Sequence, residues 1–265
     1  MNYKEKERKR KGESIVLAVL NQKGGVGKST TAINLAAALG DKGQKILLID
    51  LDPQGNTTSG LGVDKSNLDA CIYDALINDA SADDLIIKTC ADNVYLIPAT
   101  IQLTGAELEL VSAVARESRL KDVIDSVREY FDFVLIDCPP SLGLLTINAL
   151  TAADKTLIPI QCEFYALEGV SKLLDSMKLV RTRLNPKLDV FGVLMTMYDS
   201  RTSLSKQVVD EVKKYFGEKV FKTYIPRTVK LSEAPSYGVP INQYDPSGKG
   251  AIAYKDLAKE VMKRA

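Results

Sequence analysis

Residues 21–30 read NQKGGVGKST and directly follow a short apolar run, Ile15–Leu20. The glycines let the backbone curl tightly, so that several N–H groups can point at one anion. Lys28–Leu39 has helical character, and a helix that begins there brings the positive end of its dipole to the same place. A strand, a glycine-rich loop and a helix in this order predict a phosphate-binding loop. Its candidate nucleotide-binding residues are Lys23, Gly24, Gly25, Val26, Gly27, Lys28, Ser29 and Thr30.

Two side chains of this loop have distinct expected roles. We expect Lys28 to reach the β- and γ-phosphates of a nucleotide, and the Ser29 hydroxyl to ligate Mg²⁺. The loop differs from the strict pattern GxxxxGK[ST], because Gln22 stands at the position of the first glycine and Lys23 provides a second lysine. The alternative is a glycine-rich turn with solvated lysines. The strand before the loop and the helix after it argue against that alternative.

Strand-length and helix-length segments alternate along the rest of the chain. Further expected strands are Lys45–Asp50, Val94–Pro98, Phe133–Asp137, Thr156–Ile160, Val190–Met195 and Val220–Ile225. Further expected helices are Ala106–Ala115, Leu120–Phe131, Leu167–Leu184 and Leu204–Phe216. Strands that are apolar on both faces and separated by helices predict an α/β fold, with a mostly parallel twisted sheet and helices on both faces. We therefore expect one P-loop NTPase domain over residues 14–265, preceded by a basic, disordered arm at residues 1–13.

The composition excludes several kinds of chemistry. The 265 residues are 45% hydrophobic and 26% charged, which is ordinary for a globular protein with a sizeable core. There is no histidine, so mechanisms that need an imidazole base or a histidine-ligated metal are excluded. The four cysteines lack CxxC spacing. We expect them to be reduced cytosolic thiols packed as small hydrophobic residues, which argues against an iron–sulfur centre.

The net charge of +1 hides an uneven distribution of charge along the chain. Residues 1–13 carry +3, residues 14–177 carry −10 and residues 178–265 carry +8. The basic last third indicates a polyanionic partner, although a solvated face would have the same composition. The final segment, Ala253–Ala265, lacks Trp and Phe and carries acidic residues, unlike an amphipathic helix that binds lipid. We therefore expect no membrane partner.

Three aspartates stand where apolar strands end. Asp137 ends the run Phe133–Asp137, and Asp50 and Asp52 lie at the end of another run. Ligands bind outside the carboxyl ends of parallel strands and Mg²⁺ prefers oxygen ligands, so Asp137 is a candidate to hold a magnesium-bound water. Alternation puts Asp50 and Asp52 on the same side of their strand. One of them can stand in the outer shell of the metal, while the other orients a water that attacks the terminal phosphate of a nucleotide. The alternative is that these aspartates only cap strand ends and helices.

Five segments of the chain resemble one family. They are KGGVGKST at 23–30, LLIDLDPQGN at 47–56, VLIDCPP at 134–140, TMYD at 196–199, and the stretch from IPRT at 225–228 to EAP at 233–235. Together they resemble the ParA/MinD family of P-loop ATPases with a deviant Walker A loop, and within it the chromosome-partitioning ATPases called ParA or Soj. The segments extend over nearly the whole chain.

The resemblance implies catalytic roles for specific residues. It implies Mg²⁺-dependent hydrolysis of ATP to ADP and phosphate, slow in the absence of a partner protein. It assigns water activation to Asp52 and leaves Asp50 in the outer shell of the metal. It also implies that Lys23 crosses a dimer interface onto the nucleotide of the second protomer, as an arginine finger would. ATP would then drive dimerisation, and hydrolysis would release the dimer.

The resemblance also implies where the base and the cargo bind. Base contacts are implied for Pro226 and Thr228, and the family often has asparagine at the second of these positions. The family divides by partner, and the basic last third favours nonspecific DNA. The implied protein is a partitioning ATPase for a chromosome or plasmid: a homodimer with ATP that works with a ParB-like centromere-binding protein and is cytoplasmic and nucleoid-associated. Its candidate DNA-binding residues are Arg201, Arg227, Lys230, Lys213 and Lys255. The alternative is a relative that positions another protein complex without binding DNA.

Overall fold

The structure, a computed structural model, describes residues 3–4, 13–164, 166–167 and 170–265. Its centre is one sheet with the strand order β3-β4-β2-β5-β1-β6-β7. The strands are β1 (Ile15–Val19), β2 (Ile46–Asp50), β3 (Ile87–Lys88), β4 (Val94–Ile97), β5 (Phe133–Asp137), β6 (Lys155–Gln161) and β7 (Asp189–Thr196). All neighbours pair in parallel except β3 and β4, which are antiparallel. This confirms the mostly parallel α/β sheet; the short edge strand β3 was not predicted.

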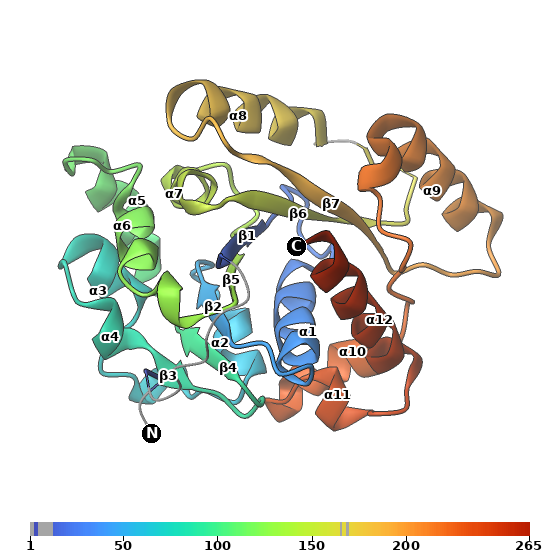
Figure 1. Cartoon of the computed structure of the whole chain (residues 1–265), viewed down its shortest axis with the longest axis horizontal. Helices are drawn as coiled ribbons and strands as arrows, with labels where there is room; N and C mark the ends of the chain where they lie inside the picture. Colours follow the sequence, from blue (N-terminus) through green and yellow to red (C-terminus); the bar gives the residue numbers. More distant parts are fainter. Residues whose placement is uncertain (1–2, 5–12, 165, 168–169) are drawn as a thin grey trace.

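Helices connect the parallel strands and lie on both sides of the sheet (Figure 1). The α-helices are α1 (Lys28–Gly40), α2 (Asn56–Gly60), α3 (Ile72–Ile77), α4 (Ala82–Leu85), α5 (Leu103–Glu109), α6 (Arg119–Asp125), α7 (Leu144–Ala152), α8 (Val170–Arg183), α9 (Ser203–Phe216), α10 (Val229–Glu233), α11 (Ile241–Tyr244) and α12 (Lys249–Arg264). Short 3₁₀ helices are η1 (Lys65–Asn67), η2 (Leu110–Ser112), η3 (Arg128–Tyr130), η4 (Gly217–Lys219) and η5 (Ala234–Tyr237). None of the helices in the described residues is long and apolar enough to cross a membrane.

An apolar layer lies on each face of the sheet, between the strands and the helices that cover that face. Because side chains alternate along a strand, Val16 and Ala18 of β1 belong to one layer and Leu17 and Val19 to the other. The first layer includes buried residues of α3 and α5 to α9, and the second includes those of α1 and α10 to α12. The strands are therefore buried on both faces, and polar side chains gather at the strand ends.

The predicted strand over Val220–Ile225 is wrong. This segment runs beside β7 and makes single bridges, from Val220 to Val193 and from Pro226 to Tyr198. Between these points the backbone N–H groups of Lys222 and Thr223 donate to the carboxylate of Glu260 on α12, at 2.9–3.1 Å. The carboxylate takes the place of a neighbouring strand, so no continuous ladder forms.

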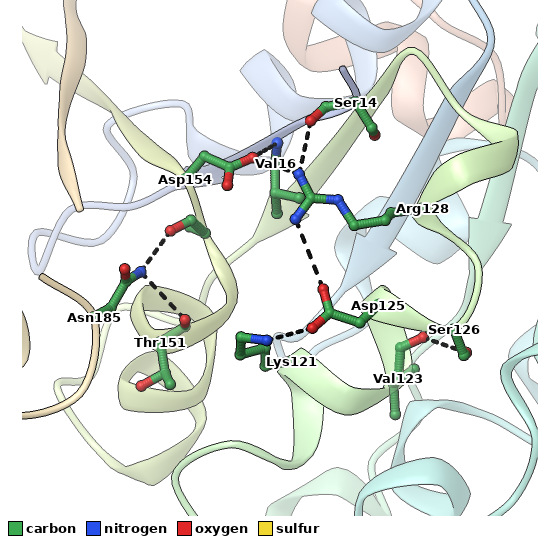
Figure 2. Close-up of polar contacts among 11 residues, drawn as sticks. Ser14, Val16, Lys121, Val123, Asp125, Ser126, Arg128, Thr151, Asp154 and Asn185 are labelled. Atoms are coloured by element: carbon green, nitrogen blue, oxygen red, sulfur yellow. Dashed lines mark hydrogen bonds and ion pairs between the residues drawn. The ribbon is translucent and has the colours of Figure 1, made fainter. Parts of the chain in front are cut away.

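At the end of the sheet where β1, β5 and β6 begin, ion pairs and hydrogen bonds join the segments that lead into these strands. Figure 2 shows the Arg128 guanidinium, which donates to the Ser14 carbonyl at 2.7 Å and to Asp154 at 2.9 Å. Asp154 also accepts from the Val16 N–H at 2.8 Å. These contacts fix the chain where it enters β1, at the edge opposite the phosphate loop.

Part of the N-terminal arm contacts the same edge. Tyr3 is buried, and its ring stacks on Phe131 at 5.6 Å between centroids and meets Tyr95 and Tyr130 edge-on. Lys4 pairs with Asp83 of α4 at 2.8 Å. Residues 5–12, on which most of the disorder prediction falls, lie outside the described residues.

Candidate nucleotide and magnesium site

The glycine-rich loop joins β1 to α1 as predicted, and its shape depends on its neighbours. Gly27 caps α1 with φ +87°, a left-handed conformation that side-chain-bearing residues rarely adopt. The Val26 carbonyl accepts a 2.8 Å hydrogen bond from the Thr196 hydroxyl at the end of β7. On the other side, the Asn21 amide donates to the Pro159 carbonyl of β6 at 2.7 Å. The loop is therefore held between two neighbouring strands before any ligand binds.

A cavity of about 540 Å³ lies against this loop. The predicted residues that line it are Gly24, Gly25, Gly27, Lys28, Ser29, Thr30 and Asp52, and Gln54, Asn56, Ser59, Pro140, Met197, Leu231, Ser232, Pro235 and Ile33 also contribute. Its wall combines backbone N–H groups at a helix start with one buried lysine, which suits the phosphates of a nucleotide.

Lys28 is a buried cation in this cavity. Its side chain is only 7% exposed, and its ammonium donates to the Lys23 carbonyl at 3.3 Å. Burial lowers the pKa of Lys28, while the nearby Asp137 and Asp52 carboxylates partly oppose that shift. An ammonium has three donors, so two remain available for phosphate oxygens.

Asp50 and Asp137 end the adjacent strands β2 and β5 in direct register and are fully buried. Burial raises the pKa of Asp137 to about 7, with a further contribution from Asp50, and the nearby hydroxyls of Thr57 and Ser29 oppose that shift. Burial likewise raises the pKa of Asp50 to about 6, against hydrogen bonds from Thr58. Two buried carboxylates side by side create a site that a divalent cation would neutralise.

The donor set at Asp137 fits Mg²⁺. One of its oxygens, Oδ2, accepts from the Thr57 hydroxyl at 2.7 Å, whereas the buried Oδ1 has no hydrogen-bond partner in the described part of the chain. The described residues contain no cluster of three or more Cys, Asp and Glu that could hold a metal by themselves. Mg²⁺ usually takes one or two protein oxygens together with substrate phosphates and waters, and the unpartnered Oδ1 of Asp137 provides one such oxygen. Ser29 and Asp137 could hold the ion beside the phosphates.

Asp50 and Asp52 differ in what they can reach. Asp52 lines the phosphate cavity, and its Oδ1 accepts from the Gln54 N–H at 3.0 Å. Asp50, like Asp137, does not line the cavity; its Oδ2 accepts from both the N–H and the hydroxyl of Thr58, at 2.8 and 2.7 Å, and its Oδ1 accepts from the Asp52 N–H at 3.2 Å. Asp52 therefore faces the cavity, whereas both carboxylate oxygens of Asp50 are already bonded to the protein.

A second cavity, of about 350 Å³, shares Gly27 and Thr30 with the first and is lined by Pro226 and Thr228. Its other lining residues are Thr196, Met197, Ile225, Arg227, Val229, Leu231, Ser232 and Tyr254. The position and apolar character of this cavity suit a nucleotide base. Sequence reasoning did not single out Met197, Leu231, Ser232 or Tyr254 as site residues, although Met197 lies within TMYD, and Leu231 and Ser232 lie between IPRT and EAP.

Glu163, which follows β6, contacts two of the predicted site residues. Its carboxylate lies 3.3 Å from the Lys23 ammonium and 3.4 Å from the Arg227 guanidinium. All three side chains are at least 39% exposed, so these ion pairs are weak in water. Lys23 thus pairs with Glu163 and does not line the cavity that contains Lys28.

The five predicted DNA-binding cations fall into two groups. Arg201 pairs with Asp199 through two bonds of 2.9 and 2.7 Å, and the Arg227 N–H bonds the carbonyl of Tyr198. Lys213 of α9 lies over the Tyr224 ring, which packs at a tilt against Tyr198. The second group flanks α11: Lys230 lies over the Tyr244 ring, and Lys255 of α12 donates to the Pro246 carbonyl. All five residues follow β7 in the sequence, in the part of the chain that contains α9 to α12 (Figure 1).

A phosphate loop at the start of α1, with carboxylates at the adjoining strand ends, defines the chain as a P-loop nucleotide hydrolase. A family model described as an AAA domain matches residues 14–190. The sporulation initiation inhibitor protein Soj of Bacillus subtilis is 58% identical over 246 residues, which cover 93% of this chain and 97% of that protein. The chromosome partitioning protein ParA of Myxococcus xanthus is 51% identical over 94% of this chain and 88% of that protein. The crystal structure of cobyrinic acid a,c-diamide synthase from Mycobacterium smegmatis with bound ADP and magnesium is also similar, with a TM-score of 0.83 and 40% identity over 94% of each chain.

The chain belongs to the ParA/MinD family of P-loop ATPases. It is an ATPase, and its nucleotide and metal are ATP and Mg²⁺. The predictions of fold class, family, enzyme class and cofactors are therefore confirmed.

Proposed function

We propose that this ATPase partitions a chromosome or plasmid. In this proposal the protein dimerises when it binds ATP, and the dimer binds duplex DNA without sequence preference. Hydrolysis of ATP then releases the protein from DNA. A ParB-like centromere-binding protein is its partner, and it works in the cytoplasm on the nucleoid. The partitioning role named for the relative from Myxococcus supports the cargo.

The nucleotide end of the switch would use the residues around the phosphate loop. Lys28 and the loop N–H groups hold the phosphates, and Ser29 and Asp137 hold Mg²⁺. Asp52 orients the attacking water, and Lys23 supplies a cation to the second protomer's nucleotide. Asp50 supports Asp52 by accepting its N–H at 3.2 Å.

The observation that carries the DNA proposal is the carboxylate shared by Lys23 and Arg227. If Lys23 moves to the nucleotide of a second protomer, Glu163 loses one of its two cations. The ion pair between Glu163 and Arg227 then changes at the same time. Arg227 also lines the second cavity. Its backbone N–H bonds Tyr198, three residues before Arg201. A change at the nucleotide can therefore reach the cations proposed to bind DNA.

The chemistry of those cations suits a phosphate backbone. Arg201 is 87% exposed and its pair with Asp199 is solvated, so a phosphate can compete for the guanidinium at little cost. A monomer presents one such set of cations, while a two-fold dimer presents two. Binding through two linked sets is much tighter than through one.

A role in positioning another complex, without DNA, is the second candidate. Its support is the acidic remainder of the chain, because residues 14–177 carry −10 and would repel a polyanion. The two candidates differ in one measurable property, namely affinity for duplex DNA in the presence of ATP.

Charge reversal at two exposed cations tests the proposal. The double variant Arg201→Glu, Lys230→Glu should dimerise normally with ATP in size-exclusion chromatography but bind duplex DNA at least tenfold more weakly, because two phosphate contacts become repulsive. Lys88→Glu, on the exposed edge strand β3, is the matched control and should bind DNA like the wild type. Wild-type DNA affinity in the double variant would place the DNA surface elsewhere.

A further inference from the structure

Helix α2 (Asn56–Gly60) places two consecutive threonine hydroxyls on the two buried carboxylates of the site. Thr57 donates to Asp137 Oδ2 at 2.7 Å, and Thr58 donates to Asp50 Oδ2 at 2.7 Å. All four side chains are fully buried. Each strand end is therefore bonded to the same turn of helix.

The position of α2 is itself fixed by contacts with the backbone. Gly55 begins the helix with φ +62°, and a Cβ atom there would come within 2.9 Å of the Ala99 carbonyl. The Thr58 hydroxyl accepts from the Ala99 N–H at 3.0 Å while it donates to Asp50. Any side chain at position 55 would push α2 away from this backbone, so the close approach requires glycine.

The two oxygens of Asp137 are unequal as a result. Oδ2 is occupied by the Thr57 hydroxyl, and Oδ1 is buried with no hydrogen-bond partner among the described residues. A carboxylate with one oxygen bonded cannot rotate freely, so the other oxygen keeps a constant direction. Hydrogen bonds of this kind orient metal ligands and raise the affinity of a site for its ion.

We propose that Thr57 is a positioning residue for magnesium, which holds Asp137 so that Oδ1 is available to the Mg²⁺ of the nucleotide complex. This inference rests on the assignment of Asp137 to the metal site. Thr57 lies five residues after Asp52, so the same bond ties the loop that carries the water-orienting carboxylate to the metal-binding strand end. Thr58 likewise holds Asp50 in place through its hydrogen bond, at the start of the loop that carries Asp52.

The test compares nucleotide binding with and without Mg²⁺, because a purely structural role would not change the ratio of the two affinities. ADP affinity is measured by calorimetry in the presence of Mg²⁺ and of EDTA. Thr57→Val keeps the shape of the side chain and removes the hydroxyl. The gain in ADP affinity from Mg²⁺ should fall at least tenfold in this variant, the size expected when a partner of a metal ligand is removed. Thr57→Ser restores a hydroxyl and should recover most of the gain.

Two further variants make the result decisive. Thr89→Val removes another buried hydroxyl, which donates to the Val94 carbonyl at 2.9 Å far from the cavity. It should lower the thermal midpoint but leave the Mg²⁺ gain unchanged. Asp137→Asn should lose the gain. An unchanged gain in Thr57→Val, with a lost gain in Asp137→Asn, would overturn the role of Thr57. An unchanged gain in Asp137→Asn would overturn the metal assignment itself.

Discussion

Replacement of Lys28 by methionine separates nucleotide binding from folding. The methionine side chain keeps most of the buried aliphatic stem and removes only the ammonium. Burial lowers the pKa of Lys28, so the charged amine costs folding free energy at neutral pH. We therefore expect the thermal midpoint of the nucleotide-free Lys28→Met protein to equal or exceed that of the wild type.

The loss of nucleotide affinity follows from the donors that Lys28 has left. Its ammonium uses one donor for the Lys23 carbonyl, which leaves two for phosphate oxygens. Charge-assisted hydrogen bonds contribute about 1.5–3 kcal/mol each, so the loss is about 3–6 kcal/mol. This corresponds to a roughly 10²–10⁴-fold weaker binding of MgATP.

Calorimetric titration with MgATP measures this loss, with thermal unfolding of the same samples as the stability readout. Lys88→Met, in the exposed strand β3, is the control and should bind MgATP like the wild type. Undiminished affinity in Lys28→Met would refute the assignment of residues 23–30 to the phosphates. A large drop in the midpoint would show instead that Lys28 stabilises the fold.

The remaining predictions concern hydrolysis and the N-terminal arm. Asp52→Ala should still bind ATP but hydrolyse it much more slowly, because the water loses its orienting carboxylate. A long-lived dimer should then appear in size-exclusion chromatography. Wild-type turnover in this variant would exclude Asp52 as the catalytic carboxylate. Tyr3→Ala should lower the free energy of unfolding by about 2–4 kcal/mol, because it empties the space between Phe131 and its aromatic neighbours. Tyr3→Phe should cost nothing in thermal unfolding, since the Tyr3 hydroxyl is buried without a partner among the described residues. Equal stability of Tyr3→Ala and wild type would mean that this packing does not contribute.

Features set by local chain geometry could be predicted from the sequence. The glycine-rich loop needs only its own backbone and the adjoining strand and helix, so its place between β1 and α1 was predicted correctly. The aspartates at the strand ends followed from the same logic, because parallel strands bring their carboxyl ends to one edge. Asp50 and Asp137 do end neighbouring strands in register.

Features that depend on side chains from distant segments could not be predicted. The failed strand over Val220–Ile225 has strand-like composition, but Glu260 of α12 takes the N–H groups that a ladder would need. The bond from Thr57 to Asp137 joins residues 80 positions apart, and no spacing rule indicates it. The sequence also predicted a group of cations in the last third of the chain. It did not predict that Lys23 and Arg227 share Glu163 as a counter-ion, because that pairing depends on where Glu163 lies after β6.

The affinity of the wild-type protein for nonspecific duplex DNA, measured with ATP, with ADP and without nucleotide, tests the central claim most directly. Fluorescence anisotropy over a series of salt concentrations provides both the affinity and the number of phosphates contacted. The account predicts tight binding only with ATP, insensitivity to DNA sequence, and an affinity that falls steeply as salt rises, since released counterions drive binding. Equal affinity with and without ATP, at every salt concentration, would contradict the ATP-switched mechanism.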